Sequence, residues 1–123
     1  MECELCGAYK NESYRTVYKD DFVFVLVNNQ AIKDGHLIVL PVRHVAHLSD
    51  LTGDEAKAFL KVTDKCMSVI AEQFDETPLC VENGWKFRTQ QHLHIHVLPS
   101  KVPLRGLFAA SEGRAERVYH EKE

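Results

Sequence analysis

The 123-residue sequence has no apolar run that approaches the roughly 20 residues a helix needs to cross a bilayer. It begins with the acidic stretch Met-Glu-Cys-Glu, where a signal peptide would carry basic residues. It also lacks repeats and low-complexity tracts, and its net charge of −3 is too small to favour nucleic acid or an anionic membrane as a partner. We therefore expect one cytoplasmic domain over residues 1–123.

Cysteine is also scarce, with four residues in a chain long enough to build a core without disulfide bonds. Cys66 lies on the apolar stripe of a predicted helix and Cys80 in a predicted strand, so both are expected to be buried thiols. Cys3 and Cys6 form a C-x-x-C turn within residues 1–10. This spacing supplies half of a tetrahedral zinc site, and free surface thiols are the alternative.

Periodicity predicts an α+β protein with an antiparallel sheet of about five strands, one long helix and a short N-terminal helix. A capping box at Thr52 and Glu55 opens a helical pattern that continues over residues 53–74. Its apolar stripe consists of Phe59, Val62, Cys66, Val69, Ile70 and Phe74. Residues 22–27 are almost continuously apolar, as in a strand buried on both faces. Further strands are expected over residues 14–19, 36–42 and 79–81, and residues 100–123 form a C-terminal extension.

The most informative stretch carries His92, His94 and His96 in strict alternation with apolar residues. A period of two indicates a half-buried strand, so the three imidazoles are expected on one exposed face, spaced about 6.5 to 7 Å apart. Imidazole acts as a nucleophile, proton donor, phosphate partner or metal ligand near neutral pH. A histidine-rich metal-binding tract is the alternative, although such tracts rarely keep a clean β alternation.

The motif His92-x-His94-x-His96 followed by two apolar residues resembles the signature of the histidine-triad (HIT) superfamily of nucleotide hydrolases and transferases. A second block, residues 28–44, is similar to that family's nucleotide-binding strand pair. The resemblance covers most of residues 1–99. It implies a HIT-like fold, a homodimer, and hydrolysis or transfer at the α-phosphate of a small nucleotide, adenine in particular.

The resemblance also implies the catalytic roles. The middle histidine, His94, would attack phosphorus while the backbone carbonyl of His92 orients its ring. His96 would bind phosphate oxygens or assist the leaving group, and the hydroxyl of Thr89 would serve that group as well. No catalytic metal is expected.

Branches of the family that begin with C-x-x-C bind structural zinc, and matching positions imply Cys3, Cys6, His44 and His92 as its ligands. His47 is the substitute ligand if the alignment slips. The side chain of His92 would bind the metal while its carbonyl serves catalysis, so the two roles are compatible.

The nucleotide-binding residues carried over from the family are Asn28, for the ribose hydroxyls, and Asn83, for phosphate. A strand-ending asparagine is the alternative for Asn28. Leu26 is a candidate for the base pocket, although core packing explains it equally well. Arg88 replaces the family's usual glutamine and suits a substrate with more phosphates. Lys101 and Arg105 would extend the phosphate site or be surface charges.

Within the enzyme class, the substrate is either a dinucleoside polyphosphate, which Asn28 and Arg88 favour, or a nucleoside phosphoramidate. Two further hypotheses are a nucleotide-binding protein without turnover and a metal-sequestering protein. The intact histidine triad argues against a pure binding protein, since binding needs no nucleophile.

Overall fold

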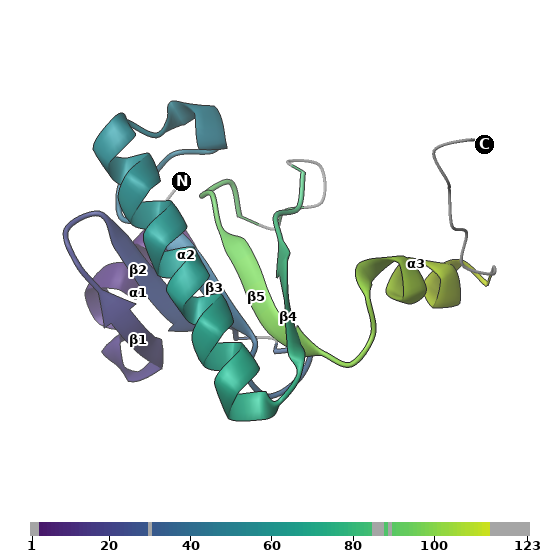
Figure 1. Cartoon of the computed structure of the whole chain (residues 1–123). Helices are drawn as coiled ribbons and strands as arrows, with labels where there is room; N and C mark the ends of the chain where they lie inside the picture. Colours follow the sequence, from purple (N-terminus) through teal and green to yellow (C-terminus); the bar gives the residue numbers. More distant parts are fainter. Residues whose placement is uncertain (1–2, 30, 85–87, 89, 114–123) are drawn as a thin grey trace.

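The computed structural model describes residues 3–29, 31–84, 88 and 90–113 (Figure 1). Its helices are α1 (Glu4–Asn11), α2 (Gly53–Phe74) and α3 (Leu104–Glu112), with 3₁₀ helices η1 (Ser13–Arg15) and η2 (Leu48–Asp50). Its strands are β1 (Thr16–Lys19), β2 (Val23–Val27), β3 (Leu37–Pro41), β4 (Thr77–Val81) and β5 (Ile95–Ser100). Within this described part, no helix is both long and apolar enough to span a membrane.

The strands form one five-stranded sheet in the order β1-β2-β3-β5-β4, and every neighbouring pair is antiparallel. The predicted α+β class, five-stranded sheet, long helix and short N-terminal helix are therefore confirmed. The triad strand begins later than the alternation predicted. His92 and His94 precede β5, and only His96 lies within it, because the backbone before Ile95 pairs with a loop residue, Val45, instead of a strand.

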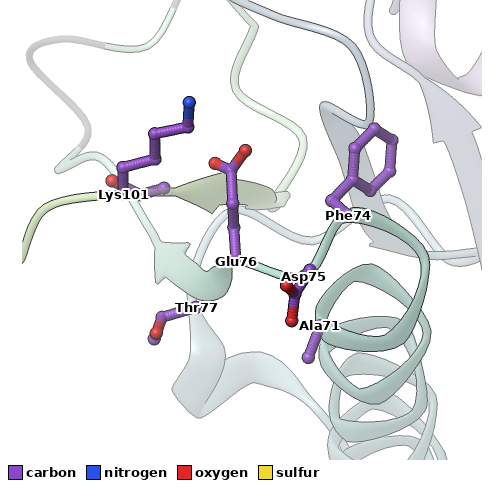
Figure 2. A pocket seen from close by; sticks show the side chains of 7 residues that line it. Ala71, Phe74, Asp75, Glu76, Thr77 and Lys101 are labelled. Atoms are coloured by element: carbon purple, nitrogen blue, oxygen red, sulfur yellow. The ribbon is translucent and has the colours of Figure 1, made fainter.

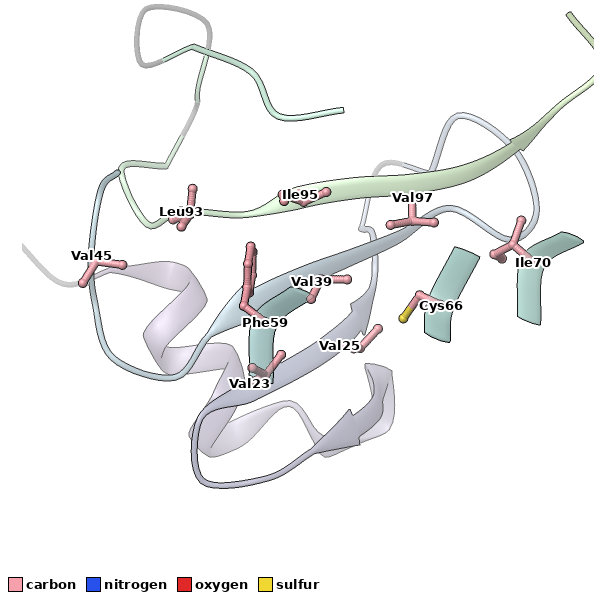
Figure 3. Close-up of a cluster of buried hydrophobic side chains, with 10 residues drawn as sticks. All are labelled: Val23, Val25, Val39, Val45, Phe59, Cys66, Ile70, Leu93, Ile95 and Val97. Carbon is pink, nitrogen blue, oxygen red and sulfur yellow. The ribbon is translucent and has the colours of Figure 1, made fainter. Parts of the chain in front are cut away.

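Alternating side chains of β2 fill two separate cores, one on each face of the sheet. Val23 and Val25 face α2 and join a cluster that continues through β3 and β5 (Figure 3). Phe24 and Leu26 belong to a second cluster that includes Leu5 of α1. Both faces of β2 are covered, as its continuous apolar run predicted.

The long helix α2 lies across one face of the sheet (Figure 1). The hydroxyl of Thr52 accepts a hydrogen bond from the Glu55 backbone N–H, and the Glu55 carboxylate accepts one from the Thr52 N–H, which confirms the capping box. Phe59, Cys66 and Ile70 of the predicted stripe are buried. The stripe is narrower than predicted, because Val69 and Phe74 are 40% and 37% exposed.

Two cysteines predicted to be buried have different surroundings. Cys66 is buried in the core beneath α2, as expected. Cys80 is exposed, so its prediction was wrong. It lies on β4, which is an edge strand of the sheet and therefore leaves part of its apolar sequence uncovered.

The turn before β3 requires glycine at position 35. Gly35 has φ of +88°, in the region that favours glycine, and a Cβ there would lie 2.7 Å from ring atoms of Phe74. The turn brings the next residue, His36, into the sheet with only 2% of its surface exposed. His36 thereby reaches the triad.

Candidate active site and metal cluster

The three triad histidines occupy two different environments. His92 is fully buried, and its Nε2–H donates a hydrogen bond to the Pro41 carbonyl at 2.7 Å. That bond leaves Nδ1 without a proton in the neutral ring, and Nδ1 lies 3.5 Å from Cys3 Sγ and 3.3 Å from Cys6 Sγ. The alternation predicted all three imidazoles on one exposed face. That prediction was wrong for His92, which is fully buried, and for His94, which is only 9% exposed.

Cys3, Cys6, His44 and His92 form a cluster whose four ligand atoms all lie within 4.8 Å of one another. A tetrahedral site with Zn–N near 2.0 Å and Zn–S near 2.3 Å has N···S edges of about 3.5 Å. The observed N···S distances are 3.3 to 3.5 Å, including 3.4 Å from Cys6 Sγ to His44 Nδ1. The four residues can hold a metal ion, and the bond from His92 to Pro41 orients its ring for that purpose.

The sequence brings these ligands together through a helix N-terminus and two loops. Cys3 is the N-cap of α1, and its sulfur accepts a hydrogen bond from the Cys6 N–H, so the C-x-x-C opens a helix instead of forming an isolated turn. The loop after β3 carries His44, and its Val45 carbonyl accepts a hydrogen bond from the Leu93 N–H at 2.7 Å. This bond fixes the distance between His44 and His92.

His47, the substitute ligand, does not belong to the cluster. It is exposed and lies at the N-terminus of the 3₁₀ helix η2, where its backbone N–H donates to Asp50 Oδ2 at 3.2 Å and its carbonyl accepts from the Asp50 N–H at 3.0 Å. Burial, followed by the hydrogen bond and charge of Cys3, raises the pKa of Cys6. A thiolate at Cys6 therefore needs a cation beside it.

His94 lies in a cavity of about 1040 Å³ that His96 also lines. Its Nδ1–H donates a hydrogen bond to the His92 carbonyl at 2.7 Å. Nε2 is therefore the unprotonated nitrogen of the neutral ring, and it carries the lone pair that a nucleophile requires. His92 thus contributes its ring to the cluster and its carbonyl to His94.

A fourth histidine, His36, joins the site, and sequence reasoning assigned it no role. Its Nδ1 accepts a hydrogen bond from the Ile32 N–H at 3.1 Å, so the proton of the neutral ring is on Nε2. That Nε2–H donates to His96 Nδ1 at 2.8 Å. The same logic places the proton of His96 on Nε2. The signal was a histidine directly after the turn glycine and ahead of an apolar strand.

His36, His96 and His94 form a histidine row, and the electrostatics of this row keep His96 neutral. Burial, followed by the charges of His94 and His36, lowers the pKa of His96 to about 4. Burial also lowers the pKa of His36. At neutral pH, His96 therefore acts as a hydrogen-bond donor through Nε2–H and not as a cation.

The structure separates the two predicted residues of the nucleoside pocket. Asn28 lines the cavity, and its Nδ2 lies 3.3 Å from His36 Nε2. Leu26 is fully buried in the α1-side core and does not line the cavity, so its assignment to the base pocket is corrected to core packing. Leu5 and Ile38, from the same cluster, line the cavity in its place because they lie at its surface.

Arg88 is committed to protein partners. Its side chain is only 3% exposed and pairs with Glu82 at 2.6 Å. It also donates to the carbonyls of Asn83 and Ala46. An internal carboxylate therefore neutralises this guanidinium, which ties the loop after β4 to the loop that carries His44. Arg88 also lines the histidine cavity, so its contact with phosphate stays a prediction. Asn83 lines the cavity, whereas Thr89 lies outside the described residues.

Lys101 does not extend the histidine cavity. It lines a separate hollow of about 720 Å³ at the C-terminal end of α2, which Figure 2 shows with Glu76 beside it. Arg105 is exposed, and neither cavity includes it among its lining residues. The surface-charge alternative fits both residues.

Comparison with known proteins agrees with this arrangement. The chain is similar to several curated proteins, including the two that follow. The nitrilase and fragile histidine triad fusion protein NitFhit of Caenorhabditis elegans is 33% identical over 109 residues, covering 86% of this chain and 24% of that protein. The bis(5'-adenosyl)-triphosphatase of Dictyostelium discoideum is 31% identical over 87 residues, covering 68% of this chain and 58% of that protein. The chain thus spans less than two thirds of either relative.

A solved structure shares the fold. The zinc-bound histidine triad family protein of Mycobacterium smegmatis superposes with a TM-score of 0.70 at 22% identity, covering 80% of this chain and 75% of that chain. A family model, the HIT domain, matches residues 10–102, which is most of the chain. The histidine row and the family match lead to the same conclusion: this chain belongs to the HIT family.

Proposed function

We propose that the chain hydrolyses dinucleoside polyphosphates at the α-phosphate through a nucleotidyl-His94 intermediate. The observation that carries the proposal is the 2.7 Å hydrogen bond from His94 Nδ1–H to the His92 carbonyl inside the cavity. It fixes the ring and leaves Nε2 as the nucleophile. The relative named bis(5'-adenosyl)-triphosphatase supports a substrate of this class.

In the first step, His94 Nε2 attacks the α-phosphorus, and the bond from phosphorus to the bridging oxygen breaks. The leaving group departs with that oxygen and its electron pair. The modified ring is then positively charged, and its Nδ1–H bond to the His92 carbonyl stabilises that charge. In the second step, water attacks phosphorus, the N–P bond breaks, and the nucleoside monophosphate leaves while one water proton passes to solvent.

The neutral state of His96 supports a polyphosphate substrate over a phosphoramidate. A phosphoramidate releases an amine, which must be protonated as it leaves, whereas a polyphosphate leaves as a stable anion without a proton. With a pKa of about 4, His96 donates a hydrogen bond to phosphate but is a poor source of protons at neutral pH. This favours the polyphosphate. Arg88, which supported the same choice from sequence, lines the cavity and is paired with Glu82.

The metal cluster supports structural zinc. Two sulfurs and two imidazole nitrogens at tetrahedral spacing are a typical zinc donor set. When bound, the ion would supply only cross-linking of the α1 N-terminus to the two loops. The zinc-bound relative of the same fold supports this choice of metal. The proposal includes no catalytic metal.

The proposal also includes a homodimer. β4 is an edge strand of the sheet, and an exposed edge presents unpaired backbone groups to a second copy. Light scattering on the purified protein tests it, and a monomeric mass would contradict it.

The test of the activity is product analysis with diadenosine triphosphate and an adenosine phosphoramidate, using wild type, His94→Ala and a matched histidine control. His47→Asn serves as the control because His47 is exposed and lies outside both the metal cluster and the cavity. We expect wild type and the control to release AMP and to prefer the polyphosphate, with activity lost in His94→Ala. A quenched reaction should show the mass of one adenylyl group on the peptide that contains His94.

Two outcomes would contradict the proposal. Wild type and His94→Ala equally inert, with nucleotide still bound, would favour a binding protein without turnover. A strong preference for the phosphoramidate would overturn the argument from the neutral His96.

A further inference from the structure

The C-terminal helix α3 has an apolar surface that the rest of the described chain leaves uncovered. Only Ala109 of this helix is buried. Leu104, Leu107 and Phe108 are 47%, 42% and 55% exposed. Exposed apolar residues that lie together on one helix indicate a binding surface more often than isolated ones do.

Two of these side chains belong to the cavity that contains the catalytic histidine. Leu104 and Leu107 line it, and their i, i+3 spacing places them on one face of α3. Phe108, although more exposed, does not line it. The segment before the helix is held in place by Ser100, whose hydroxyl donates to the Val102 carbonyl at 2.7 Å and accepts from the Val102 N–H at 3.2 Å.

Apolar residues of the sheet line the same cavity between Leu104 and Leu107 of α3 and the histidines. His96 pairs in register with Val81 of β4 on one side and with Ile38 of β3 on the other. The next pair on the same face is Leu98 with Leu79. Leu79, Val81 and Leu98 all line the cavity together with α3.

The imidazoles therefore lie between two apolar regions of one cavity. The region on the β3 side contains Leu5, Ile32 and Ile38 and has Asn28 beside it. The region on the β4 side contains Leu79, Val81 and Leu98, and Leu104 and Leu107 of α3 line the same cavity. Phosphate is recognised in the middle, and an apolar planar group has a place at each end.

We propose that Leu104 and Leu107 of α3, with the β4-side leucines, bind the second base of a dinucleoside polyphosphate, which departs with the leaving group. This inference rests on the proposed function and deepens it, because it explains why a substrate with two bases is preferred to one with a single base. A polyphosphate without a second nucleoside gains nothing by contacting five aliphatic side chains. A base, in contrast, buries the apolar surface of its ring against them.

The test compares diadenosine triphosphate with the γ-methyl ester of ATP, which keeps all three phosphates and replaces the second nucleoside by a methyl group. The variants are Leu104→Ala/Leu107→Ala and, as a control on the same helix, Phe108→Ala. We expect wild type to favour diadenosine triphosphate in kcat/KM, and the double variant to reduce this preference by roughly 10-fold. Phe108→Ala should keep the preference of the wild type.

Binding is measured separately, by calorimetry in the His94→Ala background with the same two ligands. The same roughly 10-fold loss of preference is expected in Kd. If wild type proves inert, the proposed function fails while these Kd ratios still decide the inference. Equal ratios in the double variant and Phe108→Ala would overturn the inference alone. So would a change in oligomeric mass in both α3 variants, because the helix would then contact a second copy.

Discussion

His92 and His94 are two residues apart and follow the same alternation, yet their ring nitrogens have different partners. His92 has both ring nitrogens committed, one to the Pro41 carbonyl and one towards two cysteine sulfurs. His94 has one nitrogen committed and the other available in a cavity. In the proposed mechanism, the partner of the second nitrogen, and not residue type or periodicity, decides whether a histidine here binds metal or reacts.

The two regions are also joined, because the His92 carbonyl orients His94. A change at the metal cluster should nevertheless act mainly on stability, because the cluster lies where the α1 N-terminus meets two loops, and a change in the histidine row mainly on turnover. The predictions below test that separation, in order of decreasing effect.

The largest effect is expected from removing the metal cluster. Cys3→Ala/Cys6→Ala should lose the bound zinc and several kcal/mol of unfolding free energy, roughly 4 kcal/mol, because metal binding to a folded site adds directly to stability. Metal content and thermal unfolding measure this. Cys80→Ala, at an exposed cysteine outside the cluster, is the control. Full metal content in the double variant would disprove the cluster.

The second prediction concerns His36, which acts through His96. His36→Ala should lower kcat by roughly 10- to 100-fold, because His96 loses the donor that fixes its tautomer. His36→Gln places an amide N–H near the position of Nε2 and should recover part of the loss. Equal kcat values for the two variants would mean that the hydrogen bond to His96 is unimportant.

The third prediction is a pH dependence of stability. An ordinary histidine has a pKa near 6.5, whereas folded His96 has one of about 4, so between these values the unfolded chain binds a proton that the folded chain does not. Stability should therefore fall as pH drops from about 6.5 to 4, with a share from His96 on the order of 1–2 kcal/mol. Denaturant unfolding of wild type and His96→Gln across this range measures it. Identical pH slopes would contradict the depressed pKa.

Sequence reasoning was more successful where local pattern decides structure. The capping box at Thr52 and the two-faced burial of β2 depend on spacing alone, and both are confirmed. The residues of the metal cluster came from family resemblance, and the structure brings them within reach of one another. These features require only correct alignment along the chain.

Sequence reasoning missed the contacts that depend on long-range partners. Nothing near Arg88 in the sequence shows that Glu82 and the Ala46 carbonyl occupy its guanidinium. Leu26 was a pocket candidate because alternation leaves open which face becomes cavity and which becomes core, and α1 settles that question. The role of His36 depends on a contact with His96, 60 residues further along the chain.

The smallest predicted effect tests whether the metal region depends on its connection to α2. Arg43, next to the ligand His44, donates to both carboxylate oxygens of Glu55 at 2.9 and 2.7 Å. The hydrogen bond from Arg43, followed by that from the Thr52 backbone, lowers the pKa of Glu55 to about 2. The contribution of Glu55 is therefore complete above pH 4.5 and is lost as pH falls towards 2.

Glu55→Gln keeps the shape of the side chain but removes its charge, so it should cost about 1 kcal/mol at pH 7 because Arg43 is half exposed and solvent screens the pair. The cost should shrink in acid, where wild type loses the same charge. Chelator titrations of wild type and Glu55→Gln then ask whether the loop that carries His44 loosens. Weaker zinc retention with unchanged kcat would show that the metal region responds to α2 while the histidine row does not. A matching loss of kcat would show that a change at the metal region is transmitted to the histidine row.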